Sequence, residues 1–167
     1  MTNSLYVTTL TDTYVFNPYN SLNKEIQVSD VKHILAKYNV PIDNIHNIEL
    51  YRRAFVHRSY VKRPHLDNVK NNITIVDRPE NCMSLKSKSN ERLEFLGDGV
   101  LENITKFYIY KRFPKANEGF MTEKKIALVK NEHIGKLAMQ IGLHNWFIIS
   151  KHAEEKKTRT SIKKLGC

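Results

Sequence analysis

Apolar side chains recur at helical spacing most regularly between residues 91 and 113. At about 100° per residue, five of them fall on one side of a helix, opposite four carboxylates that share a face about 80° wide. The apolar set is Leu93, Leu96, Val100, Ile104 and Phe107, and the acidic set is Glu91, Glu94, Asp98 and Glu102. Pro114 follows, and proline cannot continue a helix. The pattern predicts a long amphipathic helix over 91–113.

Shorter apolar periods and turn signals predict four further helices. Their spans are 30–38, 43–60 with Asp43 as N-cap, 121–131, and 132–142 with Gly142 as the stop signal. These helices account for most of the patterned sequence. The predicted fold class is therefore all-α, a helical bundle.

Two regions lack a sustained helical period. Residues 6–16 are rich in Thr, Tyr and Val, which suits an edge strand, and residues 17–23 read as a loop. Residues 63–90 contain two prolines and many Asn and Ser residues, so they predict a long surface loop. We therefore expect an N-terminal extension over 1–44 and one domain over 45–167, with a loop insertion at about 63–90.

Composition and net charge restrict the class of protein. The chain of 167 residues has 27 basic and 17 acidic side chains, a formal charge of +10, which indicates an anionic partner and nucleic acid first. No apolar run approaches the roughly 18 residues of a membrane span, and the N-terminus lacks a signal-peptide pattern. We expect an intracellular protein without membrane association. Two cysteines, Cys82 and Cys167, are too few for a disulfide framework.

The positive charge is distributed unevenly along the chain. Residues 1–90 carry a net charge of +4 and residues 106–167, with 14 basic and five acidic side chains, carry +9. Between them, residues 91–105 carry a net charge of −3. We interpret the basic residues near the C-terminus as contacts for nucleic-acid phosphates rather than as a solvated face. They are Lys151, Lys156, Lys157, Arg159, Lys163 and Lys164.

The acidic face has two interpretations, a solvated helix surface or a metal site. A cap at Asn90 and the helix dipole, worth about 0.3–1 kcal/mol per acid, explain Glu91 and Glu94 in the first turn. They do not explain Asp98 and Glu102, which lie two and three turns into the helix. Carboxylates on a rigid helix within a basic protein suit Mg²⁺ or Mn²⁺ and phosphodiester chemistry. Spacing alone leaves both interpretations open.

Gly97 and Gly99 favour the metal site. Each glycine costs about 1 kcal/mol relative to alanine in a helix interior. Two of them within three residues predict that another helix or a ligand approaches the backbone closely.

Four segments resemble one protein family in the same order along the chain. The segment NERLEFLGDGVL at 90–101 resembles the signature of ribonuclease III, the double-stranded-RNA endonuclease. The other three are AFVHRSY at 54–60, RFPKANEGFMTEKKIALVKN at 112–131 and IGKLAMQIGL at 134–143. The resemblance covers about residues 45–167, and the 1–44 and 63–90 segments lie outside it or only loosely within it.

The resemblance implies an all-α ribonuclease III endonuclease domain that forms a homodimer and cleaves double-stranded RNA. It implies Mg²⁺ as the cofactor, with Mn²⁺ as a possible substitute, and products with 5′-phosphate and 3′-hydroxyl ends. By motif position, Glu94 and Asp98 would bind the metal, with Asp98 nearest the reaction. Glu91 and Glu118 would complete the catalytic set as supporting acids, and Glu102 has no assigned role. No small-molecule substrate is expected.

One motif of the family has no match in the sequence. The family's second acidic motif, an Asp with a Glu three residues later, corresponds to TSIKKLGC at 160–167, where the Asp position falls on Cys167. No segment resembles the family's double-stranded-RNA-binding domain either, so we expect a domain that is incomplete at its C-terminus. Three hypotheses remain open: a Mg²⁺-dependent endonuclease, a non-catalytic member that binds structured RNA, and a fragment without a stable fold.

The other candidate residues are expected to be structural. The seven histidines, His57 among them, show no metal-ligand spacing, so a zinc site is not expected. Trp146 and Phe147 are expected in the core rather than in a base-stacking platform. The abundance of Lys, Asn and Ile and the long insertion resemble family members from large DNA viruses, which would place the protein in the cytoplasm or nucleus of an infected cell.

Overall fold

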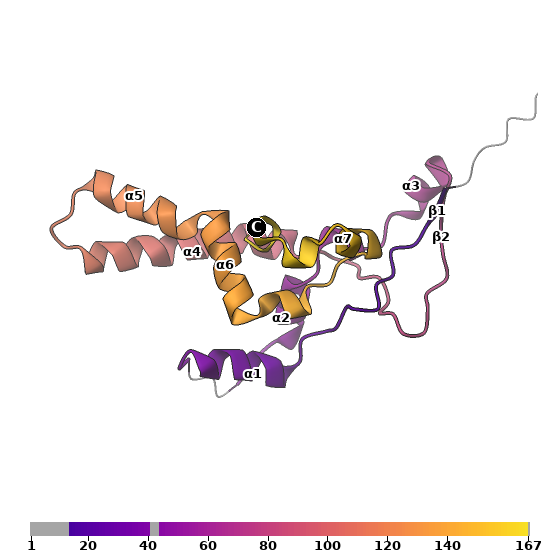
Figure 1. The fold of residues 1–167 in the computed structure, drawn as a ribbon, viewed down its shortest axis with the longest axis horizontal. Helices are drawn as coiled ribbons and strands as arrows, with labels where there is room; N and C mark the ends of the chain where they lie inside the picture. The colour runs from indigo at the N-terminus through magenta and orange to yellow at the C-terminus, as the bar shows by residue number, and fades with distance from the viewer. Residues whose placement is uncertain (1–13, 41–43, 167) are drawn as a thin grey trace, which may run out of the picture.

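The computed structural model describes residues 14–40 and 44–166, and most of them form helices. Helices α4 (Glu91–Arg112) and α5 (Glu118–Val129) form a hairpin that extends from one end of the molecule (Figure 1). A parallel pair of short strands, β1 (Tyr14–Phe16) and β2 (Ile73–Ile75), lies at the other end. The predicted, mainly helical fold is confirmed. In the part of the chain that the structure describes, no helix combines the length and the apolar character needed to cross a membrane.

The remaining elements lie between these two ends. The helices are α1 (Val28–Lys37), α2 (Ile48–Ala54), α3 (His65–Lys70), α6 (Asn131–Ile141), α7 (Lys151–Glu155) and α8 (Ile162–Leu165). Short 3₁₀ turns η1 (Arg58–Tyr60), η2 (Leu143–Trp146) and η3 (Thr158–Thr160) connect some of them. Residues 6–13 of the predicted strand, the predicted N-cap Asp43 and Cys167 lie outside the described residues.

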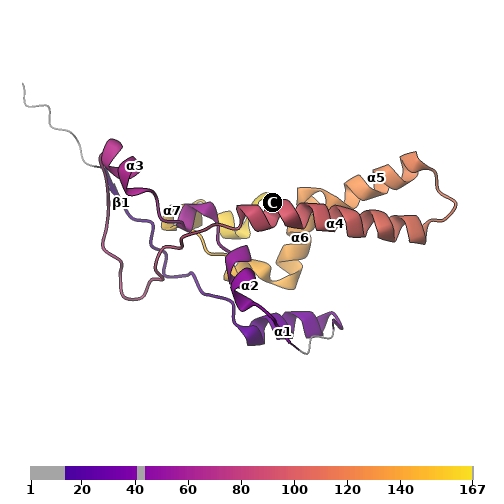
Figure 2. The ribbon, with the colours of Figure 1, turned by 180° about the vertical axis from the view of Figure 1, so that it is seen from behind.

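Caps and breakers set the ends of the helices around the hairpin. Helix α4 begins at Glu91 as predicted and runs from the centre of the molecule to the tip of the hairpin (Figure 2). Helix α5 begins before the predicted residue 121, because the Asn117 Oδ1 caps it by accepting a hydrogen bond from the Phe120 amide at 2.9 Å. Gly142 ends α6 with a φ of 88°, which confirms the predicted stop signal.

Tertiary pairing shortens the second predicted helix. Helix α2 stops at Ala54, because the chain then pairs with a distant segment. The Ile148 amide donates to the Phe55 carbonyl at 2.9 Å, and the His57 amide donates to the Ile148 carbonyl at 3.0 Å. This bridge buries Val56 beside Ile148, so the helix predicted over 43–60 does not continue through it.

The 63–90 segment contains regular structure and contacts the core. It contributes α3 and β2, and β2 pairs with β1 so that Ile75 lies opposite Phe16. Farther along, the Lys86 amide donates to the Tyr60 carbonyl at 3.0 Å, and the buried Tyr60 hydroxyl donates to the Met83 carbonyl at 2.8 Å. The single surface loop predicted here is therefore wrong for residues 65–75, because the pairing partner of β2 comes from the N-terminal segment.

The N-terminal segment packs into the same body as the helices. Asn20 and Asn23 are buried, and their side-chain amides donate to the Ile149 carbonyl at 3.3 and 2.9 Å. The Asn20 amide also donates to Glu154 at 2.7 Å, and Arg159 donates to the Asn23 Oδ1 at 3.0 Å. The division into a 1–44 extension and a 45–167 domain stays a prediction, but these contacts join the two parts through buried polar groups.

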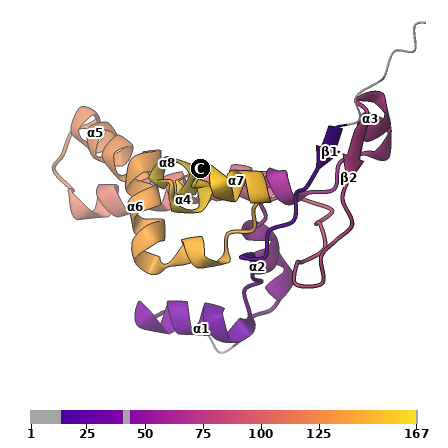
Figure 3. The same ribbon diagram turned by 45° about the vertical axis from the view of Figure 1, so that its right-hand side comes forward.

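The closest helix packing joins α6 to α8 (Figure 3). A Cβ atom at Gly135 would lie 1.9 Å from the Ile162 carbonyl oxygen, and one at Gly166 would lie 1.8 Å from the Asn131 carbonyl oxygen. Backbone atoms cannot move away as a flexible side chain can. The absence of a side chain at both glycines therefore permits this approach.

We expect Gly135→Ala to lower the free energy of unfolding by about 1–3 kcal/mol, the range for overpacking in a filled interior. Gly119→Ala is the matched control, because the nearest atom to its new Cβ would be 3.6 Å away, an ordinary contact. The control should be neutral or slightly stabilising. Urea denaturation measures both, and equal stabilities of the two variants would contradict the packing described for α6 and α8.

Candidate functional site

The N-terminal half of α4 lines a pocket of about 260 Å³. Glu94 and Asp98 contribute carboxylates to it from successive turns of the helix. Apolar side chains from α4, α5 and α6 form much of the remaining lining, among them Leu101, Val129 and Ile134. The structure thus brings the two predicted metal ligands into one pocket.

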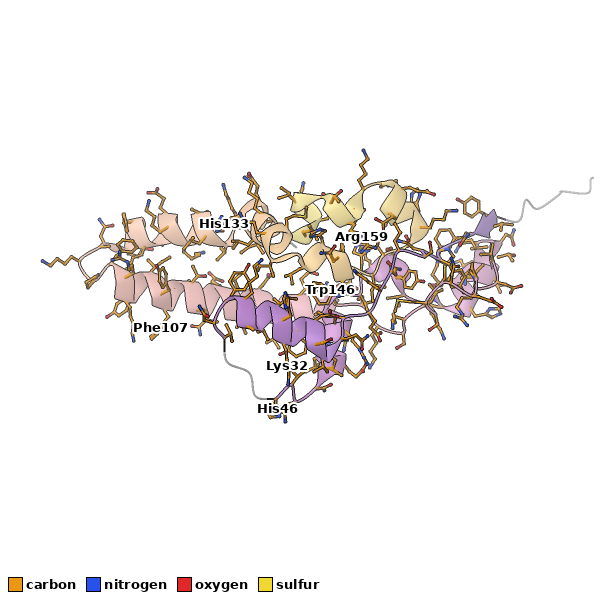
Figure 4. All side chains as sticks on the ribbon, turned by 60° about the horizontal axis from the view of Figure 1, so that its bottom comes forward. Lys32, His46, Phe107, His133, Trp146 and Arg159 are labelled. Carbon is orange, nitrogen blue, oxygen red and sulfur yellow. The ribbon has the colours of Figure 1, made fainter. Side chains whose placement is uncertain are left out.

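The opposite, apolar side of α4 is exposed to solvent. In Figure 4, Phe107 lies on the side of α4 that faces away from α5. The buried positions of the helix are Thr105 and Ile109, which lie near the acidic side of the predicted helical wheel. The amphipathic helix is confirmed, but its apolar side does not face the core of this chain. We call the exposed residues Leu96, Val100, Ile104 and Phe107 the apolar stripe, and their exposed fractions are 63, 50, 60 and 59%.

Glu102 belongs to an ion-pair cluster outside the pocket. Its Oε1 lies 3.0 Å from the Lys106 Nζ and 3.1 Å from the Lys125 Nζ. Hydrogen bonds from these two lysines lower the pKa of the Glu102 carboxyl group. Glu102 and Lys106 are four residues apart, the spacing at which helix side chains meet, so this partner could have been found in the sequence. Lys125 comes from α5 and has no such local signal.

Glu91 and Glu118 lie outside the pocket that Glu94 and Asp98 line. Glu91 accepts a hydrogen bond from the Ser89 hydroxyl at 2.7 Å. Glu118 lines a different pocket, between α4 and α5, and accepts a hydrogen bond from the Thr122 hydroxyl at 3.1 Å. Within residues 14–40 and 44–166, no three His, Cys, Asp or Glu side chains form a potential metal site. The catalytic roles of these four acids stay predictions.

Glu94 and Asp98 differ from the other acids of α4 because their carboxylates are unpartnered. Neither side chain forms a hydrogen bond or an ion pair with another residue of the described chain. Like charges at this spacing destabilise a helix by about 0.2–0.5 kcal/mol, and among the described residues no basic side chain lines the pocket to offset that. A cation between the two carboxylates would remove the repulsion.

No part of the described chain approaches Gly97 or Gly99. A Cβ atom at either position would have nothing within 4 Å. The predicted approach of another helix is therefore wrong within this chain. Gly97 lines the pocket beside Glu94 and Asp98, which leaves its open side to a ligand.

Comparison with known proteins identifies the fold and the family. Residues 91–166 match the family model of the ribonuclease III domain. A mimivirus protein named a probable ribonuclease 3 is 31% identical over 153 residues, which is 91% of this chain. The chain belongs to the ribonuclease III family. A ribonuclease 3 of Enterococcus faecalis is 34% identical over 115 residues, 69% of the chain. The chain spans only 27% of the mimivirus protein and 42% of the Enterococcus protein.

Solved structures of a ribonuclease III nuclease domain share the fold. The domain from Campylobacter jejuni matches with a TM-score of 0.60 at 23% identity, over 84% of this chain and 75% of that one. A second structure of this domain was reported for structural flexibility in the region involved in dimer formation. It matches with a TM-score of 0.59 at 23% identity, over 81% of this chain and 76% of that one. At this identity the likeness establishes the fold of the ribonuclease III domain.

Arg159 has a structural role rather than the predicted phosphate contact. Its guanidinium donates to the backbone carbonyls of His144 and Phe147 and to the Glu154 carboxylate, at 2.7 Å for the shortest bond to that group. Its side chain is only 12% exposed. The prediction that Arg159 contacts nucleic-acid phosphates is therefore wrong, because its donors are used inside the protein.

His57 forms a half-buried junction near the N-terminus of α4. Its Nδ1 accepts a hydrogen bond from the Ser59 amide at 3.2 Å and lies 2.8 Å from the Ser59 hydroxyl. Because the amide can only donate, Nδ1 is an acceptor and the hydroxyl donates to it. Burial, and then the charges of Arg58 and Lys164, lower the pKa of His57, so the neutral ring is the stable form.

We expect His57 to make the stability of the domain depend on pH. Above pH 6.5, the pKa of an unperturbed histidine, the ring is neutral in both the folded and the unfolded chain. Below this pH the unfolded chain takes up a proton more readily than the folded chain, so the free energy of unfolding falls. His57→Asn keeps a side-chain acceptor for the Ser59 amide but cannot take up a proton. The free energy of unfolding of this variant should therefore fall less between pH 7.5 and 5.5 than that of the wild-type chain.

The matched control is His46→Asn, which removes an exposed histidine and leaves the half-buried ring in place. Urea denaturation at several pH values measures the slope for each protein. The control should keep the wild-type slope. If His57→Asn also keeps it, the half-buried ring does not couple folding to protons.

Proposed function

We propose that this ribonuclease III domain hydrolyses phosphodiester bonds of double-stranded RNA, with Mg²⁺ held by Glu94 and Asp98. The observation that carries the proposal is the pair of unpartnered carboxylates in one pocket of the matched domain. The relatives named ribonuclease 3 are much longer than this chain, so the activity, the substrate and the partners are all part of the proposal.

The donor set of the pocket fits Mg²⁺. Proteins usually hold this ion through one or two carboxylates, and water and substrate phosphates complete its octahedral shell. Within residues 14–40 and 44–166, the pocket offers two carboxylates and no basic side chain that would compete for them. Mn²⁺ prefers similar oxygen ligands and should substitute. When bound, the ion would activate water for in-line attack on phosphorus and stabilise the leaving 3′ oxygen, which gives 5′-phosphate and 3′-hydroxyl ends.

Basic side chains outside the pocket support a polyanionic substrate. Lys151, Lys156, Lys157 and Lys164 are exposed in the C-terminal segment, and none has a hydrogen bond or ion pair from its ammonium group within the described residues. Each phosphate that such a lysine neutralises releases a counterion, which favours binding at low salt. Glu91 and Glu118, placed outside the pocket, would act as supporting acids only if substrate or a second copy of the chain brought them to the reaction.

A non-catalytic member that binds structured RNA is the second candidate. The observation that favours it is the number of carboxylates, because two rather than three or more converge in the described residues. The same cleavage assay separates the two candidates.

We expect Asp98→Asn to reduce cleavage of long duplex RNA by about a hundredfold or more, since it removes one of two charges that hold the metal. RNA binding should survive, because the lysines are unchanged. Glu102→Gln is the matched control: it also removes a carboxylate from α4, but one that is paired with Lys106 and Lys125. Cleavage with and without Mg²⁺, and a gel-shift assay of binding, measure the two effects.

Wild-type cleavage by Asp98→Asn would contradict the assigned metal site. Binding of RNA without any cleavage by the wild-type chain in Mg²⁺ would instead support the non-catalytic candidate.

The apolar stripe supports a homodimer. Leu96, Val100, Ile104 and Phe107 expose a continuous apolar face along α4. Large apolar patches of this kind are uncommon on monomers and mark interaction surfaces. We infer that a second copy of the chain covers the stripe through a two-fold contact, in which the same surface is used on both sides.

We expect Leu96→Glu to convert the dimer to a monomer, because the interface would bury an unpaired charge. Leu22→Glu is a closely matched control, since Leu22 is also 63% exposed but lies outside the stripe. Sedimentation velocity over a range of protein concentrations measures the state of each variant. A wild-type chain that stays monomeric, or a Leu96→Glu variant that still dimerises, would rule out this interface.

A further inference from the structure

Another pocket, of about 260 Å³, lies toward the β1–β2 end of the molecule. The N-terminal segment, the η1 region, the 63–90 segment and the start of α7 all line it. Apart from Ser150 and His152, its lining residues lie outside the 91–166 match to the ribonuclease III domain. Most of this pocket therefore belongs to a part of the chain that the family model does not match.

Hydrogen bonds between its walls hold the pocket in shape. Strand pairing sets Phe16 opposite Ile75, and the Lys151 amide donates to the Pro18 carbonyl at 3.1 Å. The Ser150 amide donates to the Ser59 hydroxyl oxygen at 3.0 Å. Each of these bonds joins residues that are far apart in the sequence, so the pocket exists before any ligand binds.

The lining combines an apolar surface with unpaired cationic groups. Phe16, Pro18, Val61, Ile75 and Leu85 supply the apolar part. Arg58 and Arg63 supply the cationic part, and no Asp or Glu is found among the described lining residues. His152 also lines the pocket, but its Nδ1 lies 4.0 Å from a carboxylate oxygen of Glu155. Neither the Arg58 nor the Arg63 guanidinium has a hydrogen-bond or ion-pair partner in the described chain, so their donors are available to an anion.

We propose that this pocket binds one nucleoside monophosphate unit. A guanidinium matches a phosphate group with two parallel hydrogen bonds, which explains two arginines without an acidic partner. A nucleobase is a flat apolar ring that can stack on Phe16 and fill the space beside Ile75 and Leu85. The volume is just below the roughly 300 Å³ at which typical small-molecule sites begin, so it suits one nucleotide and not two.

Two sources can supply this chemistry, a free mononucleotide or the terminal nucleotide of an RNA strand. The pocket does not include Glu94 or Asp98, and its occupation does not require cleavage. The proposal therefore stands or falls independently of the nuclease activity proposed above.

Isothermal titration calorimetry of the full chain with adenosine monophosphate tests the pocket. The dissociation constant should be at least about tenfold lower than for adenosine or for inorganic phosphate, because each of these offers only half of the contacts. Arg58→Gln combined with Arg63→Gln should raise it about tenfold or more. Both arginines are exposed and unpaired, so thermal unfolding should confirm that this variant keeps its fold. Lys32→Gln, an exposed and distant basic residue, is the matched control and should leave binding unchanged (Figure 4).

Competition then identifies the source of the nucleotide. A short single-stranded RNA with a 5′-phosphate that displaces adenosine monophosphate, while the same RNA with a 5′-hydroxyl does not, assigns the pocket to strand ends. Failure of both RNAs to compete assigns it to free mononucleotides. Undetectable binding of adenosine monophosphate, binding no tighter than that of phosphate, or equal binding by the double arginine variant would overturn the proposal.

Discussion

The guanidinium of Arg159 holds together three segments that no periodic pattern connects. It donates to Asn23 from the N-terminal segment, to the carbonyls of His144 and Phe147 around η2, and to the Glu154 carboxylate of α7. Burial opposes ionisation of Glu154, but hydrogen bonds from Arg159 and Asn20 lower its pKa below the usual range. A partly buried charge needs hydrogen-bonding partners, so the loss of one partner would leave the others without theirs.

Both pockets depend on the course that this junction gives to the C-terminal segment. On one side of Arg159, the chain enters α7 and contributes Ser150 and His152 to the arginine-lined pocket. On the other side it leads into α8, which packs closely on α6, and then to Gly166, which lines the pocket of Glu94 and Asp98. The partly buried pair of Arg159 and Glu154 thus lies within a segment that contributes to two sites, and these sites have no lining residue in common.

Local signals predicted the helices well and their surroundings poorly. The wheel for 91–113 gave the extent of α4 to within a residue, because proline and periodicity act within one segment. It did not show that Leu96 and Ile104 are exposed while Ile109 is buried, since amphipathicity distinguishes two faces without indicating what covers each. Likewise, β2 was missed because its partner β1 is a distant segment, and the bridge from Val56 to Ile148 ended a helix that the sequence pattern would have continued.

The same limit applied to the acids of α4. Motif position indicated Glu94 and Asp98, but the sequence could not show that these two carboxylates lack partners while Glu102 is paired with Lys125 of α5. Whether a carboxylate forms an ion pair depends on the side chains that the tertiary structure places beside it. Acids that look equivalent on the helical wheel can therefore differ in their partners.

The arrangement around α4 relates the proposed assembly to the proposed chemistry. The centre of the apolar stripe lies about 145° around the helix from Glu94 and Asp98, since successive residues advance by about 100°. A second copy packed on the stripe would therefore cover the apolar side of α4 and leave the side with the two carboxylates open. Because one rigid helix carries both surfaces, the contact between copies would also fix the relative positions of the two carboxylate pairs. A polyanion could then reach both pairs from the sides of α4 that the dimer leaves free, and the exposed lysines beyond the pocket would supply the positive charge to hold it there.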